Sequence, residues 1–172
     1  LSPWMQKLPG GLIHVNVVGC ALFAAISGSS AATVATVGKM SIPELRKRNY
    51  PEKILLGSLA GSGTLGLLIP PSIILIIYGV TVQESIAKLF IAGIIPGIMI
   101  AIIFMLYVIV WSLINKKIMP ETFENFSFFE KVKRSRQLIP VILLILGVIG
   151  SIYTGIATAT EAASLGVVGA LI

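Results

Sequence analysis

Two short stretches of serine, glycine and proline interrupt an otherwise apolar sequence, and both could bind ions through oxygen atoms. The first is Ser27-Gly28-Ser29-Ser30, and the second is the run GSGTLGLLIPPS at residues 61–72. Where a helix stops, its last carbonyl groups lack partners and carry partial negative charge. Such carbonyls, with serine hydroxyls beside them, suit a hard cation such as Na⁺. The free N–H groups at the start of the next half-helix suit a carboxylate substrate.

The composition indicates the environment in which these stretches must fold. Hydrophobic residues make up 56% of the 172 residues and charged residues only 12%, with a mean hydropathy of +0.98. A soluble domain of this size cannot bury so much apolar surface, so we predict an all-α integral membrane protein. Because the chain begins at Leu1 and ends in an apolar run, we expect it to be part of a longer polypeptide.

The net charge of +6 comes from two short segments rather than from one basic surface. Five of the 13 lysines and arginines fall within residues 39–53, and six fall within residues 116–136. Apolar runs separate these segments, so the positive-inside rule places both on the cytoplasmic side. The charge therefore indicates membrane topology, and we expect no nucleic-acid partner.

Each interruption has two interpretations. An unpaired backbone group in hydrocarbon costs several kcal/mol, so broken backbone needs protein around it. Two half-helices that meet at Ser27–Ser30 would form a re-entrant hairpin with both ends cytoplasmic, although a single span over residues 11–38 stays open. The stretch at 61–72 contains Pro70 and Pro71, which predict either a broken helix or a kinked one packed through small residues. Two such interruptions together point to a transporter binding site.

The choice of coupling ion depends on the titratable residues found inside the apolar runs. No Asp or Glu lies inside an apolar run, and His14 is the only titratable candidate for a proton carrier there. We therefore favour Na⁺ over H⁺, and we expect His14 and Asn16 to be packing residues. An intramembrane serine hydrolase is a different function class. It would require His14 to reach Ser27, about 20 Å away along one helix, so we expect no enzyme activity.

Four Ser/Thr-x-x-Glu patterns, which are typical of helix N-termini, predict helix starts at Ser41, Thr81, Ser127 and Thr158. Together with the apolar runs, they divide the chain into six expected segments. These are a hairpin (1–38), a basic cytoplasmic loop or helix (39–53), a broken transmembrane helix (54–80), a transmembrane helix (81–114), a cytoplasmic linker (115–137) and the start of a second repeat (138–172).

The motifs FAAISGSSAATVATVG, GSLAGSGTLGLLIPPSIILIIYG, KLFIAGIIPG and TGIATATEAASLGVVGAL resemble the large membrane subunit of tripartite ATP-independent periplasmic (TRAP) transporters. The resemblance covers nearly the whole chain. It implies a fragment of an inverted-repeat, elevator-type transporter in the bacterial inner membrane. It also implies Na⁺-coupled uptake of an organic acid, such as a C4-dicarboxylate or a sialic acid. The implied partners are a small membrane subunit, a periplasmic substrate-binding protein and membrane lipid.

The same resemblance implies a set of Na⁺ ligands. Its first choices are Ser27, Ser29, Gly66, Ile69 and Pro71, the last three through their carbonyls. Its second choices are Ser30, Gly63 and Thr64. One departure is the Ala159 that stands where the family commonly has proline, and it leaves the Thr158–Glu161 capping pattern intact. The alternative function is a Na⁺/anion symporter of related fold that works without a binding protein.

Overall fold

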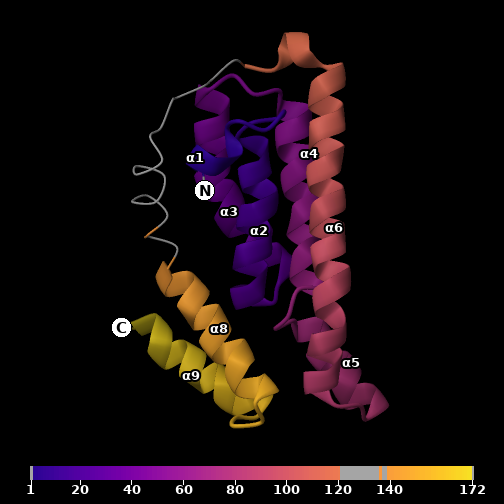
Figure 1. Cartoon of the computed structure of the whole chain (residues 1–172), viewed down its shortest axis with the longest axis vertical. Helices are drawn as coiled ribbons and strands as arrows, with labels where there is room; N and C mark the ends of the chain where they lie inside the picture. The colour runs from indigo at the N-terminus through magenta and orange to yellow at the C-terminus, as the bar shows by residue number, and fades with distance from the viewer. Residues whose placement is uncertain (1, 121–135, 137–138, 172) are drawn as a thin grey trace.

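The structure, a computed structural model, describes residues 2–120, 136 and 139–171, and all regular secondary structure in these ranges is helical (Figure 1). This confirms the all-α class. The helices are α1 (Ser2–Met5), α2 (Ile13–Ser27), α3 (Ser30–Lys47), α4 (Glu52–Gly63), η1 (Thr64–Leu67), α5 (Ile73–Val82), α6 (Ile86–Ile114), η2 (Lys116–Ile118), α8 (Ile139–Tyr153) and α9 (Ala159–Leu171).

Helices α2 and α3 form a hairpin whose tip is the predicted break. Gly28 ends α2 with a φ of 59°, a left-handed conformation that glycine adopts at little steric cost. Ser29 then caps α3, because its hydroxyl accepts a hydrogen bond from the Ala32 N–H at 3.4 Å. The two helices therefore meet within Ser27–Ser30, as the sequence predicts.

The predicted end of the hairpin at residue 38 is wrong. Helix α3 continues to Lys47 and contains Pro43, so the basic segment 39–53 begins as a helical arm. Leu45 on this extension is buried beside Leu12 and Tyr50 in one core cluster. Tertiary packing of its apolar side thus keeps the segment helical.

The predicted span at 54–80 is divided into α4, η1 and α5, and residues 68–72 join η1 to α5 without helix. The alternative of a kinked but continuous helix is therefore wrong. Helix α2 packs against α3 and α4, and α6 packs along α2, α4 and α5. In the described part of the chain, α6 is the one helix both long and apolar enough to span a membrane.

Two of the predicted helix starts are wrong. Ser41 lies inside α3, and Thr81 lies inside α5, where its hydroxyl donates to the Ile77 carbonyl at 2.8 Å. Helix α6 starts after Ser85 instead. The start at Thr158 is confirmed, since the Thr158 N–H donates to the Glu161 carboxylate at 2.8 Å. The pattern at Ser127, like most of the predicted linker, lies outside the described residues.

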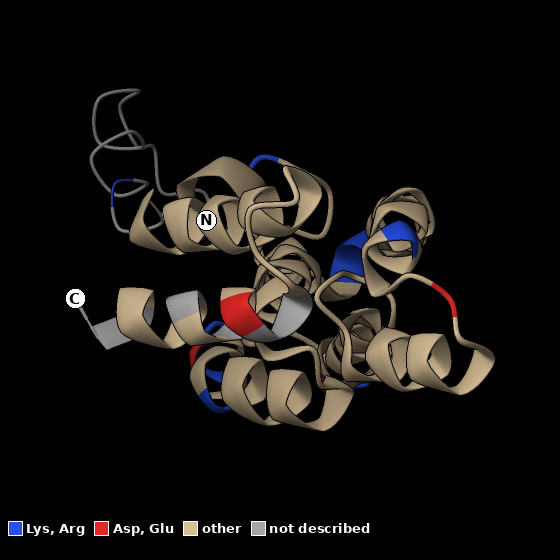
Figure 2. Ribbon diagram, turned by 90° about the horizontal axis from the view of Figure 1, so that it is seen from below, with Lys and Arg blue, Asp and Glu red and all other residues tan. Residues whose placement is uncertain are grey.

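The two ends of the helical body differ in sequence. The α3–α4 connection and η2 lie toward one end, and most of the described basic residues of the two segments belong to or adjoin them, while the α5–α6 connection lies toward the other end (Figure 1). The hairpin tip reaches only part of the way along α6, to about the level of the break between α4 and α5 (Figure 1). Seen from the α5–α6 end, most of the ribbon is uncharged (Figure 2).

Candidate functional site

The tip of the α2–α3 hairpin lies directly against the break between η1 and α5. The Ile73 N–H donates to the Gly28 carbonyl at 3.3 Å. A Cβ placed on Gly66 would lie 2.8 Å from the Ser29 carbonyl carbon and 2.9 Å from the Ser30 nitrogen. Glycine at position 66 is therefore what permits this backbone-to-backbone approach.

The two prolines expose carbonyl groups at the break. In a continuous helix, the Gly66 and Leu67 carbonyls would accept hydrogen bonds from residues 70 and 71, but proline has no N–H group. The Leu67 carbonyl instead accepts from the Ser72 hydroxyl at 2.8 Å. The Ile73 N–H, which would ordinarily bond Ile69, donates to the hairpin tip. The Gly66 and Ile69 carbonyls thus lose their usual helical donors close to the hairpin tip.

The hydroxyl groups of the tip form a local network. The Ser27 and Thr33 hydroxyl oxygens lie 3.0 Å apart. The Ser29 carbonyl accepts from the Thr33 N–H at 3.0 Å and from the Thr33 hydroxyl at 2.7 Å. These bonds fix the loop between the helices and hold its oxygen atoms beside the broken helix.

The first-choice Na⁺ ligands lie at this junction. Ser27 and Ser29 form the tip, while Gly66, Ile69 and Pro71 belong to the break. The Pro71 carbonyl oxygen would be 2.6 Å from a Cβ on Gly28. Gly66 and Pro71 thus contact the tip directly, whereas Ile69 lies between them in the sequence and packs against Gly97 on α6.

The second-choice ligands divide between the junction and its edge. Ser30 begins α3 directly against Gly66, and Gly63 packs against Val34 from that same helix. Thr64 is exposed, and its hydroxyl donates to the Gly61 carbonyl in the last turn of α4 at 2.7 Å. Thr64 is therefore not directed toward the tip.

Four residues that support the junction are absent from the sequence prediction. Thr33 is fully buried and follows Ser29 by one helical turn, a spacing visible in the sequence. Ser72 is equally buried, and its hydroxyl donates to the Leu67 carbonyl in place of the N–H group that Pro71 lacks. Gly93 and Gly97 on α6 form a small-residue pair four apart. A Cβ on Gly93 would lie 2.9 Å from the Leu68 carbonyl oxygen, so α6 supports the break closely.

Helix termini set the electrostatics of the junction. Helix α2 and η1 end here, and α3 and α5 begin here. The ending helices present carbonyls with partial negative charge, and the beginning helices present N–H groups with partial positive charge. One junction can thus accommodate a cation and an anionic group side by side. The described residues contain no group of three or more His, Cys, Asp or Glu side chains suited to a metal ion.

The buried polar groups at the opposite end of α2 have packing roles, as the sequence predicts. The His14 Nε2–H donates to the Pro9 carbonyl at 2.8 Å. Asn16 donates to the Leu55 carbonyl at 3.3 Å and to the Ser58 hydroxyl at 3.1 Å. His14 lies in the first turn of α2 and Ser27 is its last residue. The two are therefore too far apart for a hydrolase pair.

Residues 5–172 match the family described as "Tripartite ATP-independent periplasmic transporter, DctM component". The chain is 39% identical, over 92% of its length, to the C4-dicarboxylate TRAP transporter large permease protein DctM of Pseudomonas aeruginosa, of which it covers 36%. It is 37% identical over 98% of its length to an ectoine/5-hydroxyectoine large permease of Ruegeria pomeroyi, of which it covers 39%. It is 38% identical over 90% of its length to the sialic acid TRAP transporter permease of Haemophilus influenzae, of which it covers 24%. The chain therefore spans well under half of each of these relatives.

Proposed function

Because the chain belongs to the DctM family of tripartite ATP-independent periplasmic transporter permeases, we propose that the full-length protein takes up an organic acid anion with Na⁺. The protein is a transporter component rather than an enzyme. A small membrane subunit and a periplasmic substrate-binding protein would complete it in the bacterial inner membrane. In this arrangement the binding protein delivers the anion and the sodium gradient drives its entry.

One observation carries the proposal: the hairpin tip is seated on a helix break whose carbonyls have lost their usual helical donors. Neutral backbone and hydroxyl oxygens are ligands of hard cations. Discontinuous helices with such oxygens are also the usual architecture of ion-coupled transporter sites. The ion would lie between Ser27 and Ser29 on one side and the carbonyls of Gly66, Ile69 and Pro71 on the other.

The substrate class follows from the same helix termini and from the relatives. The starts of α3 and α5 favour negative charge. The relatives are named for C4-dicarboxylate, sialic acid, isethionate and ectoine. A carboxylate-bearing organic acid, of the C4-dicarboxylate or sialic acid class, fits the helix termini and the relatives named for those two substrates.

The membrane arrangement is part of the proposal. The α2–α3 hairpin would be re-entrant, with both arms opening to the cytoplasm, because the α3–α4 connection and η2, with most of the described basic residues of segments 39–53 and 116–118, lie at one end of the molecule. Helix α6 would cross the membrane fully. The hairpin and broken helix would form the mobile half of one elevator-type repeat.

The test is uptake by the full-length permease in proteoliposomes with its small subunit and a candidate binding protein. We expect uptake of the labelled acid with an inward Na⁺ gradient. A pH gradient in Na⁺-free buffer should give no uptake, and robust uptake in that arm would contradict Na⁺ coupling. Omitting the binding protein should also abolish uptake. Full uptake without it would favour the binding-protein-independent symporter instead.

A further inference from the structure

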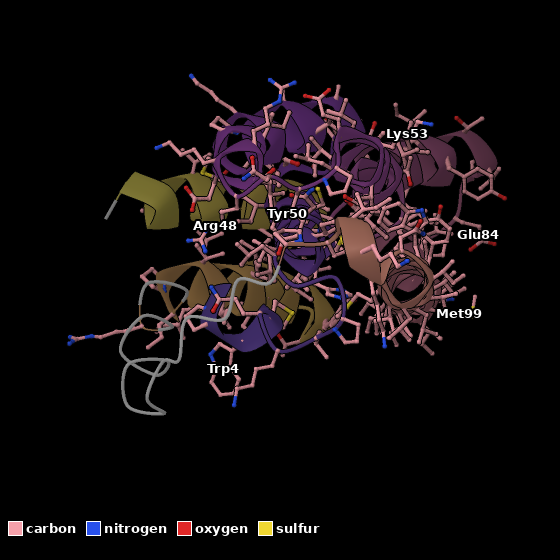
Figure 3. The ribbon with its side chains drawn as sticks, turned by 90° about the horizontal axis from the view of Figure 1, so that it is seen from above. Trp4, Arg48, Tyr50, Lys53, Glu84 and Met99 are labelled. Atoms are coloured by element: carbon pink, nitrogen blue, oxygen red, sulfur yellow. The ribbon has the colours of Figure 1, made fainter. Side chains whose placement is uncertain are left out.

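A pocket of about 360 Å³ lies where the turn between α1 and α2 meets the end of α6. It is at the end of the molecule opposite to the α5–α6 connection, away from the hairpin tip. Figure 3 looks onto this end and places Tyr50 near the middle of the helices. The polar side chains of its lining are Gln6, Lys7, Tyr50, Ser112 and Lys116.

The inner part of this pocket contains buried polar atoms without partners. Gln6 is only 4% exposed and Ser112 only 3% exposed. The Gln6 Oε1 and the Ser112 hydroxyl make no hydrogen bond within the described structure. Buried polar atoms of this kind are costly unless a ligand or water pairs with them. Tyr50 accepts a bond from the Leu12 N–H at 3.1 Å, so its own hydroxyl hydrogen can be donated.

The mouth of the pocket is positively charged. Lys7 and Lys116 are exposed there, and neither makes an ion pair with any described residue. The carboxylates of the neighbouring α3–α4 region are occupied elsewhere. Glu44 pairs with Arg48 and Glu52 pairs with Arg46, both at 2.8 Å. The pocket therefore favours an anion held by two ammonium groups and by hydroxyl donors.

We propose that this pocket binds the headgroup of an anionic phospholipid of the phosphatidylglycerol type. The phosphate would accept hydrogen bonds from Lys7, Lys116 and the Ser112 hydroxyl. Gln6 Oε1 is an acceptor and needs a hydrogen-bond donor. A hydroxyl of the headgroup glycerol supplies one, whereas an ionised phosphodiester oxygen does not. Basic pockets at the cytoplasmic end of membrane helices are typical sites for such headgroups.

The surface beside the pocket favours a lipid over a free phosphate compound. Leu113 lines the pocket and is 46% exposed. Val110 and Leu106 are exposed on the same face of α6, one and two turns back from Leu113 toward the start of the helix. Acyl chains would continue from the pocket along this apolar strip. A bound lipid would then connect the α1–α2 turn to the end of α6.

The experiment measures ligand binding to the purified, delipidated full-length permease. The probe is short-chain dihexanoyl phosphatidylglycerol, with the matching phosphatidylcholine as the zwitterionic control and glycerol 3-phosphate as the free anion. We expect selective binding of phosphatidylglycerol. Removing both charges in Lys7→Gln/Lys116→Gln should weaken it about 25-fold, because each lysine contributes about fivefold.

Matched variants separate this site from general surface charge. Lys53→Gln/Lys117→Gln removes two exposed lysines at the same end but outside the pocket, and it should bind as the wild type does. Gln6→Leu should weaken phosphatidylglycerol but not phosphatidic acid, which has no glycerol headgroup. Equal binding of phosphatidylcholine, equally tight binding of glycerol 3-phosphate, or unchanged binding by the Lys7/Lys116 variant would each overturn the proposal.

Discussion

Gly66 and Ser29 are in backbone contact, although 37 positions separate them in the sequence. A Cβ on Gly66 would lie 3.0 Å from the Ser29 carbonyl oxygen and closer still to the carbonyl carbon. This contact joins the broken helix to the hairpin tip at the level where both helices stop. Any change in it must separate the two sets of oxygen atoms that we propose to share one ion.

Gly66→Ala is therefore expected to impair transport severely. The added methyl group meets backbone atoms, which cannot move aside as a flexible side chain could. Overpacking of this kind costs about 1–3 kcal/mol, so the Na⁺ concentration for half-maximal transport should rise at least about fivefold. The measurement is Na⁺-dependent uptake by the full-length transporter in proteoliposomes.

The matched control for this change is Gly57→Ala on α4. A Cβ at Gly57 would meet no atom within 4 Å, so this variant should transport normally. Normal Na⁺ dependence in Gly66→Ala, with the protein correctly folded in the membrane, would show that the junction does not hold the coupling ion.

Asn16 is expected to connect the hairpin to α4. It is fully buried, and its amide donates to both Leu55 and Ser58 on α4. Asn16→Ala should lower the free energy of unfolding by about 0.5–1.5 kcal/mol and reduce transport, because the hairpin arm loses its polar connection to α4. Thermal unfolding of the purified full-length permease and uptake assays check both effects.

Asn115→Ala is the control for the Asn16 prediction, because the Asn115 amide donates only to the Trp111 carbonyl of the adjoining helix at 2.9 Å. It should leave transport unchanged. A double-mutant cycle of Asn16→Ala with Ser58→Ala should show non-additive destabilisation. Additive effects would mean that this pair does not link the two helices.

Both helix breaks could be predicted from the sequence because their causes are local. Gly28 between serines supports a left-handed helix end, and Pro70 and Pro71 delete donors at fixed positions. The Thr158–Glu161 cap is likewise local and is present in the structure. Such features depend on residues within a few positions of each other, so a single sequence contains the necessary information.

The remaining features depend on contacts between distant segments. Leu45 extends α3 past the predicted boundary because it packs against the start of α2. The capping pattern at Ser41 is overridden by the same packing. The predicted ligands in η1 and in the connection between η1 and α5 came from family resemblance, and only the folded chain shows that Gly66 contacts Ser29. Thr33 and the Gly93/Gly97 pair gain their roles from neighbours that spacing alone does not identify.

The membrane orientation can be tested by cysteine labelling. Lys47 and Gln83 are both exposed, at the end of α3 and at the end of α5 respectively, toward opposite ends of the molecule. With the basic segments cytoplasmic, an impermeant thiol reagent added outside intact cells should label Gln83→Cys and not Lys47→Cys. Cys20, the native cysteine of this chain, is buried and should react little. Labelling of Lys47→Cys alone would reverse the orientation.

The Ser27 hydroxyl is expected to contribute directly to Na⁺ affinity, with Thr33 acting through it. Ser27→Ala removes one neutral oxygen at the tip, so the Na⁺ concentration for half-maximal uptake should rise on the order of tenfold, equivalent to about 1.4 kcal/mol. Thr33→Val should have a smaller effect, because it removes the hydroxyl 3.0 Å from Ser27 and not the proposed ligand. The double variant should resemble Ser27→Ala, since both changes act on one network.

Thr81→Val serves as the control, because its exposed hydroxyl bonds only within α5, and it should leave Na⁺ dependence unchanged. Additive effects of Ser27→Ala and Thr33→Val, or a Ser27→Ala variant with wild-type Na⁺ dependence, would remove Ser27 from the ion site.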